Sequence, residues 1–135
     1  MTNYWILKSE PDVYSYDTLQ KDGMGIWDGV RNYQARNNLK AMKVGDLALF
    51  YHSNIGKEVV GIAKITKESY QDPTTEDKNW VVVEVEPVEK LKKPVTLSAI
   101  KKDDMLSQIM LVRNGRLSVI PLKKEEFDRI LALSV

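Results

Sequence analysis

Hydrophobic residues of this chain gather into short runs that are typical of β-strands. Five runs are separated by polar or glycine-containing stretches: 4–9 (YWILKS), 47–53 (LALFYHS), 58–65 (EVVGIAKI), 79–91 (NWVVVEVEPVEKL) and 116–122 (RLSVIPL). In the fourth run Val81, Val83 and Val85 alternate with glutamates. This alternation predicts a strand with one buried face and one solvated face.

Residues 33–42 have helical spacing instead. Ala35, Leu39 and Met42 fall on one face, as expected of a stripe that packs against a core. The opposite face carries Tyr33, Arg36, Asn37 and Lys40. Four further helices are predicted over 16–21, 97–102, 104–110 and 123–133, the first three capped by Ser15, Thr96 and Asp103.

Five or six short strands with short helices between them, in 135 residues, predict one domain over residues 1–135. The expected fold class is mixed α/β, with a compact barrel-like sheet and the helices packed around it. An open doubly wound sheet would need longer and more regular βαβ units.

Composition narrows the chemistry. The chain has no cysteine and a single histidine, His52, so thiolate sites are excluded and a protein-only zinc or iron site is disfavoured. No cofactor and no metal are therefore expected. The first residues lack the pattern of a signal peptide, and the longest apolar runs are too short to cross a membrane. We expect a cytoplasmic protein without a membrane partner.

The net charge of +1 is unevenly distributed. Residues 90–102 carry five lysines and no acid, whereas residues 68–89 carry seven acids and one lysine. Such asymmetry can mark an edge that faces a polyanion. Taken alone, it is interpreted here as a solvated surface.

Catalysis is the weaker hypothesis. His52 and Ser53 are neighbours in a strand, so their side chains point to opposite faces and cannot form a nucleophile and base pair. A triad would need a serine and a carboxylate brought to His52 by the fold, either Ser9 or Ser118 with Glu10 or Asp28. The chain has no nucleophile elbow, P-loop or Gly-x-Gly-x-x-Gly motif. We predict that it is not an enzyme, with a hydrolase that uses His52 as the alternative.

The segment 26–40 (IWDGVRNYQARNNLK) has an unusual composition. Trp27 stands beside the turn-forming pair Asp28-Gly29, and guanidinium and amide side chains follow, among them Arg31, Asn32, Gln34, Arg36 and Asn37. Unpaired bases stack on aromatic rings, and guanidinium and amide groups bind base edges and phosphates. The alternative is that Trp27 fills a gap in the sheet while the polar residues cap helix ends. Composition alone leaves both open.

Two strand ends carry further polar and aromatic groups. They are Lys8, Ser9 and Glu10 after the first run, and Tyr51, His52 and Ser53 at the end of the second. Clefts form where strands end, since the middle of a sheet is filled by core side chains. These six residues are candidates for the lining of a binding site.

At these motifs the chain resembles the EVE domain family, within the PUA-like group. The resemblance runs in order through WILKSEP (5–11), WDGVRNYQARN (27–37), GDLALFYHS (45–53), GIAKI (61–65), KLKKPVTL (90–97), RLSVIPL (116–122) and the final helix. It implies a PUA-like small twisted β-barrel. It also implies a module that binds a modified base in DNA or RNA, such as 5-methyl- or 5-hydroxymethylcytosine, without catalysis.

The resemblance implies roles for eleven residues. Trp27 would be a stacking wall, and the six strand-end residues would line the pocket or its rim. The remaining four would hold base edges, phosphates or the loop itself: Arg31, Asn32, Arg36 and Asn37. Modified DNA or RNA is the expected partner of a monomer, and a domain that binds a peptide or small metabolite is a further alternative.

Overall fold

The computed structural model describes residues 2–135, and six strands form its single sheet. The order across the sheet is β2-β5-β4-β3-β1-β6, with β1 parallel to β3 and all other pairs antiparallel. The strands are β1 (Tyr4–Ser9), β2 (Gly25–Trp27), β3 (Leu47–His52), β4 (Glu58–Gln71), β5 (Val81–Thr96) and β6 (Val119–Leu122). The predicted mixed α/β fold with five or six strands is confirmed.

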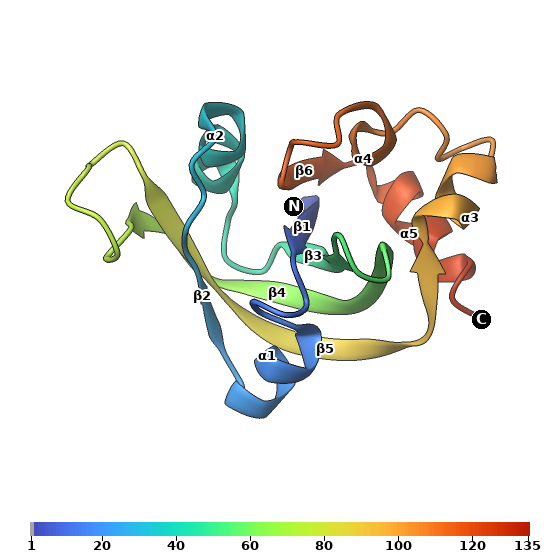
Figure 1. Cartoon of the computed structure of the whole chain (residues 1–135), viewed down its shortest axis with the longest axis horizontal. Coiled ribbons are helices and arrows are strands. Elements are labelled where there is room, and N and C mark those ends of the chain that lie inside the picture. Colours follow the sequence, from blue (N-terminus) through green and yellow to red (C-terminus); the bar gives the residue numbers. More distant parts are fainter. Residues whose placement is uncertain (1) are drawn as a thin grey trace.

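Two of the strands are longer than predicted, β4 by six residues and β5 by three. β4 has 14 residues and β5 has 16, and their pairing shifts register at four places. Such irregularities bend a strand and increase its twist. Figure 1 shows both strands curving through the whole length of the molecule, so this pair gives the sheet its barrel-like shape.

Five helices surround the sheet: α1 (Tyr16–Asp22), α2 (Tyr33–Ala41), α3 (Leu97–Lys102), α4 (Met110–Arg113) and α5 (Lys124–Ala132). The first three begin at side-chain caps, in which Ser15, Asn32 and Thr96 accept a hydrogen bond from a backbone N–H of the first turn. In Figure 1, α2 lies at the end where the loop between β4 and β5 projects, and α3, α4 and α5 gather at the other end.

The helix predicted over 104–110 is wrong. Residues 103–109 form turns, and α4 begins only at Met110. Asp103 ends α3, because its N–H donates to the carbonyl of Ile100. Its carboxylate also accepts from the N–H of Met105 at 3.0 Å and pairs with Arg129 of α5 at 2.7 Å. Asp103 therefore joins two elements and does not start a new helix.

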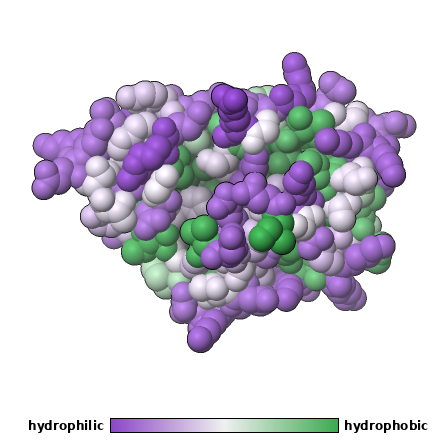
Figure 2. All heavy atoms as spheres, viewed as in Figure 1, coloured by the Kyte–Doolittle hydropathy of each residue, from purple (hydrophilic) through white to green (hydrophobic). Residues whose placement is uncertain are grey.

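The core is one cluster of buried aliphatic and aromatic side chains between the sheet and the helices. On the face seen in Figure 2, hydrophilic side chains cover most of the surface, with hydrophobic ones in smaller groups between them. A buried carboxylate, Asp46, joins β1 to the turn before β3. It accepts hydrogen bonds from the N–H of Asn3 (3.0 Å), Nε1 of Trp5 (3.1 Å) and the N–H of Lys43 (2.9 Å).

None of the helices within residues 2–135 has the length and apolar character needed to cross a membrane.

The close approach of β4 to α1 depends on Gly61. A Cβ atom at this position would lie less than 3.0 Å from ring carbons of Tyr16, which is fully buried. We predict that Gly61→Ala lowers the free energy of unfolding by about 2–3 kcal/mol, since overpacking forces the ring or the backbone to move. Urea denaturation would measure this. The control is Gly115→Ala, where the added Cβ meets no atom within 4 Å, and a change of equal size there would contradict the packing argument.

Candidate functional site

A hollow of about 450 Å³ opens beside β2. We name it the β2 pocket, and its lining comes from the end of β1, the loop after β1, β2 with the loop that follows it, and the approach to β6. The lining residues are Lys8, Ser9, Val13, Tyr14, Ile26, Trp27, Asp28, Gly29, Val30, Arg31 and Ser118. Its volume lies in the range of roughly 300–1,000 Å³ that is usual for small-molecule sites.

Two aromatic rings stand in the wall of the β2 pocket. Trp27 and Tyr14 meet edge to face, with centroids 6.2 Å apart, and Trp27 also packs edge to face on Phe50 at 5.3 Å. Only 6% of Trp27 is exposed. Trp27 therefore belongs to the core and also lines the pocket. This position is compatible both with a ring that fills a gap in the sheet and with a ring that forms the wall of a binding site.

Charged groups of both signs stand in the lining. Lys8 is partly buried, its Nζ donates to the carbonyl of Gly115 at 2.8 Å, and burial lowers the pKa of its ammonium group. The carboxylate of Asp28 is exposed and takes part in no hydrogen bond or ion pair within residues 2–135. The hydroxyl of Ser9 donates to the carbonyl of Tyr14 at 2.6 Å, which holds the loop after β1 against that strand.

A buried carboxylate fixes the loop that follows β2. Asp72, at the end of β4, is fully buried and accepts from the N–H of Gly29 (3.0 Å) and Nη1 of Arg31 (2.9 Å). It also accepts from the N–H and hydroxyl of Thr74, at 2.7 and 2.6 Å. Burial alone raises the pKa of Asp72, but the hydrogen bonds from Thr74, Arg31 and Gly29 outweigh it and hold the pKa well below its ordinary value.

Four of the eleven predicted site residues lie together in the β2 pocket: Lys8, Ser9, Trp27 and Arg31. Three others lie along or before α2. Asn32 is the cap of this helix and accepts from the N–H of Ala35 at 2.9 Å. Arg36 and Asn37 bond to each other on its outer surface, with Nη2 of Arg36 donating to Oδ1 of Asn37 at 2.8 Å.

The last four predicted residues lie outside the pocket lining, near the ends of β1 and β3. Tyr51 is buried, and Glu10 accepts a hydrogen bond from Asn54. The N–H of Ser53 donates to the carbonyl of Ser9 at 2.9 Å. Nε2 of His52 accepts from the N–H of Tyr16 at 3.1 Å, and burial lowers the pKa of this imidazole.

Seven lining residues were not predicted as binding residues: Val13, Tyr14, Ile26, Asp28, Gly29, Val30 and Ser118. Asp28 and Gly29 stand directly beside Trp27, so their proximity was available from the sequence. Tyr14 and Ser118 reach the pocket only through the fold, because the loop after β1 turns back and β6 pairs with β1.

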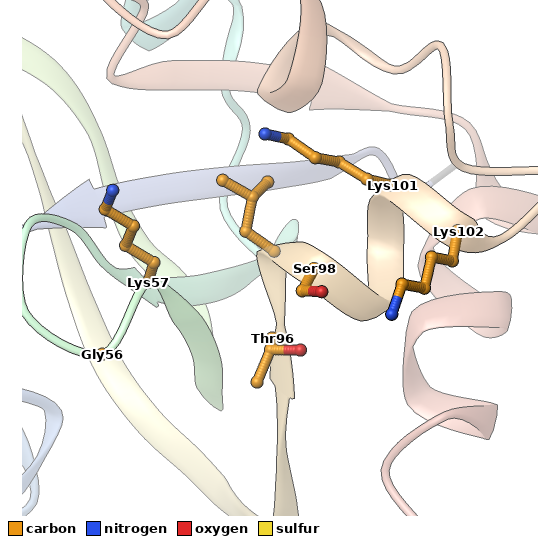
Figure 3. A pocket seen from close by; sticks show the side chains of 7 residues that line it. Gly56, Lys57, Thr96, Ser98, Lys101 and Lys102 are labelled. Carbon is orange, nitrogen blue, oxygen red and sulfur yellow. The ribbon is translucent and has the colours of Figure 1, made fainter.

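A second and larger hollow, of about 560 Å³, lies between the hairpin after β3 and the start of α3. Figure 3 shows Lys57 and Lys101 on opposite sides of it, with Ser98 and Lys102 on α3. The lining of this second hollow contains no aromatic side chain and no acidic group, so all of its charged side chains are lysines. Within residues 2–135, no three histidine or carboxylate side chains are placed so that they could share a metal ion.

The chain is similar in sequence and in fold to several known proteins. A family model described as EVE domain matches residues 3–133. Thymocyte nuclear protein 1 of Mus musculus is 38% identical, over 98% of this chain and 74% of that protein. A crystal structure from Agrobacterium tumefaciens has a TM-score of 0.96 and 41% identity, and covers 98% of this chain and 93% of its own. Human THYN1 in complex with 5-methylcytosine-containing DNA has a TM-score of 0.91 and 35% identity, and covers 98% of both chains.

We predict that Asp72→Asn lowers the free energy of unfolding by about 2 kcal/mol, because N–H donors lose a buried charged acceptor. Arg31 keeps 39% of its side chain exposed, so the loss is smaller than for a fully buried ion pair. Since the pKa of Asp72 lies below 3.8 in the folded chain, this stabilisation is complete above pH ~4 and disappears as the pH falls further.

Chemical denaturation of both proteins across this pH range measures the difference. Asp77→Asn is the control, because this carboxylate belongs to the same loop but is exposed. A difference between wild type and Asp72→Asn that did not shrink in acid would contradict the role of the charge.

Proposed function

This chain belongs to the EVE domain family, and from that premise we propose that it is a nucleic-acid-binding module whose β2 pocket receives a modified cytosine of DNA. The observation that carries the proposal is the pairing of two aromatic walls, Trp27 and Tyr14, with the unpartnered carboxylate of Asp28 in one hollow. The complex of human THYN1 with 5-methylcytosine-containing DNA supports the choice of ligand.

Aromatic walls supply a driving force for taking up a base. Extruding a base from a duplex costs a few kcal/mol, and stacking on aromatic side chains returns roughly 1–3 kcal/mol for each base. Trp27 is anchored on Phe50, and the ring of Tyr14 packs against the rings of both Trp27 and Phe50. Because both rings are fixed before the ligand arrives, little side-chain entropy is lost on binding.

The polar groups suit the edge of cytosine. A carboxylate accepts from the exocyclic N4 amino group of cytosine, and a lysine donates to acceptor atoms of a base. In the β2 pocket, Asp28 supplies such a carboxylate and Lys8 supplies such a donor. Thymine presents a carbonyl oxygen where cytosine has the amino group, so it would leave the carboxylate of Asp28 facing another acceptor.

The methyl group alone adds little selectivity. Val13, Ile26 and Val30 provide apolar lining, and burying one methyl group contributes about 0.8 kcal/mol. This amounts to about fourfold in affinity. A 5-hydroxymethyl group would need a hydrogen-bond partner in the same place to be preferred further.

We propose that the domain binds without catalysis. The hydroxyl of Ser9 is used by the carbonyl of Tyr14, and Nε2 of His52 is used by the N–H of Tyr16. These bonds engage the hydroxyl of Ser9 and Nε2 of His52, the two groups that a hydrolase mechanism through Ser9 would need free. RNA as a ligand in place of DNA, a monomeric state and a cytoplasmic location stay predictions from the sequence.

The test is a panel of DNA oligonucleotides that differ at one position: cytosine, 5-methylcytosine, 5-hydroxymethylcytosine or thymine. We expect 5-methylcytosine to bind better than cytosine by a few-fold, and better than thymine by about tenfold, since each good edge contact discriminates by roughly 1–3 kcal/mol. Thymine carries the same methyl group, so the second comparison isolates the edge contact. Fluorescence anisotropy at fixed ionic strength measures all four affinities.

In Asp28→Ala we expect the preference over thymine to fall to about twofold, while the preference over unmodified cytosine stays. Asp104→Ala is the matched control, since it removes an exposed carboxylate beyond α3. Equal binding of all four oligonucleotides by the wild type would sink the proposal.

A further inference from the structure

Next to the β2 pocket, four side chains follow one another in a stack. The guanidinium carbon of Arg31 lies 5.6 Å from the ring centre of Trp80, Trp80 and Tyr33 have centroids 5.0 Å apart, and the guanidinium carbon of Arg36 lies 5.0 Å from the ring centre of Tyr33. They come from the loop after β2, the residue before β5, and α2. We name this stack the Arg–aromatic ladder.

The core does not require the ladder. Neither Tyr33 nor Arg36 belongs to the buried residues of α2, Ala35 and Leu39: Tyr33 is exposed and Arg36 is half-buried. Tyr33 is 59% exposed and is the most exposed aromatic side chain within residues 2–135. A helix face turned to solvent is usually polar, so a stacked tyrosine at this place points to a binding role.

The ladder is also fixed in position. Nε and Nη2 of Arg36 donate to Oδ1 of Asn37 at 3.1 and 2.8 Å, and Nη1 donates to the carbonyl of Asn79 at 3.4 Å. Arg31 is held by Asp72. The planes of both guanidinium groups are therefore set before any ligand binds.

The charges of the two arginines differ in availability. The charge of Arg31 is compensated by the buried carboxylate of Asp72. Arg36 forms no ion pair with any residue from 2 to 135, so its charge remains available to a phosphate. Arg31 also lines the β2 pocket, so the ladder begins where the pocket ends.

We propose that the Arg–aromatic ladder is a second nucleotide subsite, which holds an unpaired nucleotide next to the one in the β2 pocket. Its base stacks on the guanidinium plane of Arg36 at the end of the ladder, which the ring of Tyr33 supports from the other side, and its phosphate lies near the same guanidinium. Aromatic rings and guanidinium planes are the surfaces on which unpaired bases stack, and such stacking tolerates any base. This inference rests on the proposed function of the pocket.

The experiment compares three probes: 5-methyl-deoxycytidine monophosphate, a short single-stranded DNA with one central 5-methylcytosine, and the same DNA with abasic sites on both sides of that base. Affinities are measured by titration calorimetry for wild type, Tyr33→Ala and Tyr33→Leu. The leucine variant keeps apolar contact with Trp80 but has no π-face. Met105→Ala is the control, because it removes a side chain of similar exposure, 53%, at the other end of the molecule.

We expect both Tyr33 variants to bind the intact DNA about tenfold more weakly and to bind the other two probes like the wild type. The abasic DNA should bind the wild type with the affinity that the Tyr33 variants show for the intact DNA. A loss that is equal for the monophosphate would overturn the proposal, because Tyr33 would then act on the pocket itself. Unchanged binding of the intact DNA would overturn it too.

The two proposals fail in different ways. If the panel of four oligonucleotides shows no preference for 5-methylcytosine, but binding of the single-stranded DNA still depends on Tyr33 and on the flanking bases, the preference proposed for the pocket is wrong and the ladder is supported. If methylated DNA is preferred and the Tyr33 variants bind like the wild type, the proposal of a second subsite is wrong and the function proposed for the pocket is supported. If no DNA binds at all, both fall.

Discussion

The buried carboxylate of Asp72 is the group on which the geometry of the site depends. It accepts four hydrogen bonds, and two of them come from the loop between β2 and α2. A buried charge without partners would cost several kcal/mol, so the loop is held where its donors satisfy that charge. The same bonds place Trp27 and Asp28 at the pocket and Arg31 at the start of the ladder. One interaction thus fixes both proposed binding surfaces relative to each other.

The sheet brings the other half of the pocket to this loop. β1 and β3 are parallel and in register, with Ser9 opposite His52, so polar residues that end each strand meet at one edge. His52 and Tyr51 then serve the structure there, through the bond to Tyr16 and through burial. Lys8 and Ser9, on the neighbouring strand β1, line the β2 pocket. Parallel pairing explains why residues 43 positions apart gather, and why only some of them are available to a ligand.

Much of the fold could be predicted from the sequence, because alternation, apolar spacing and caps are local signals. The cap at Asn32 follows the same local rule, although the composition of the loop pointed equally to base recognition. The turns at 103–109 could not be foreseen, since the partner that holds Asp103 is Arg129, 26 positions away. Tyr14 and Trp80 were missed for a related reason. Each acts through a ring contact with Trp27 or Tyr33 from a distant segment, and no periodicity records such a contact.

The small number of available positive charges limits the phosphate contacts that this surface can make. Protein–DNA affinity usually comes from many lysine and arginine contacts to phosphates, and these carry no sequence information. Here Asp72 compensates Arg31, Nζ of Lys8 is bonded to the carbonyl of Gly115, and Asp28 adds a negative charge at the pocket. Arg36, unlike Arg31, forms no ion pair with an acid among residues 2–135. A net charge of +1 therefore leaves little binding energy that is independent of the base. Stacking and edge contacts must supply most of it, and these are the terms that distinguish one base from another.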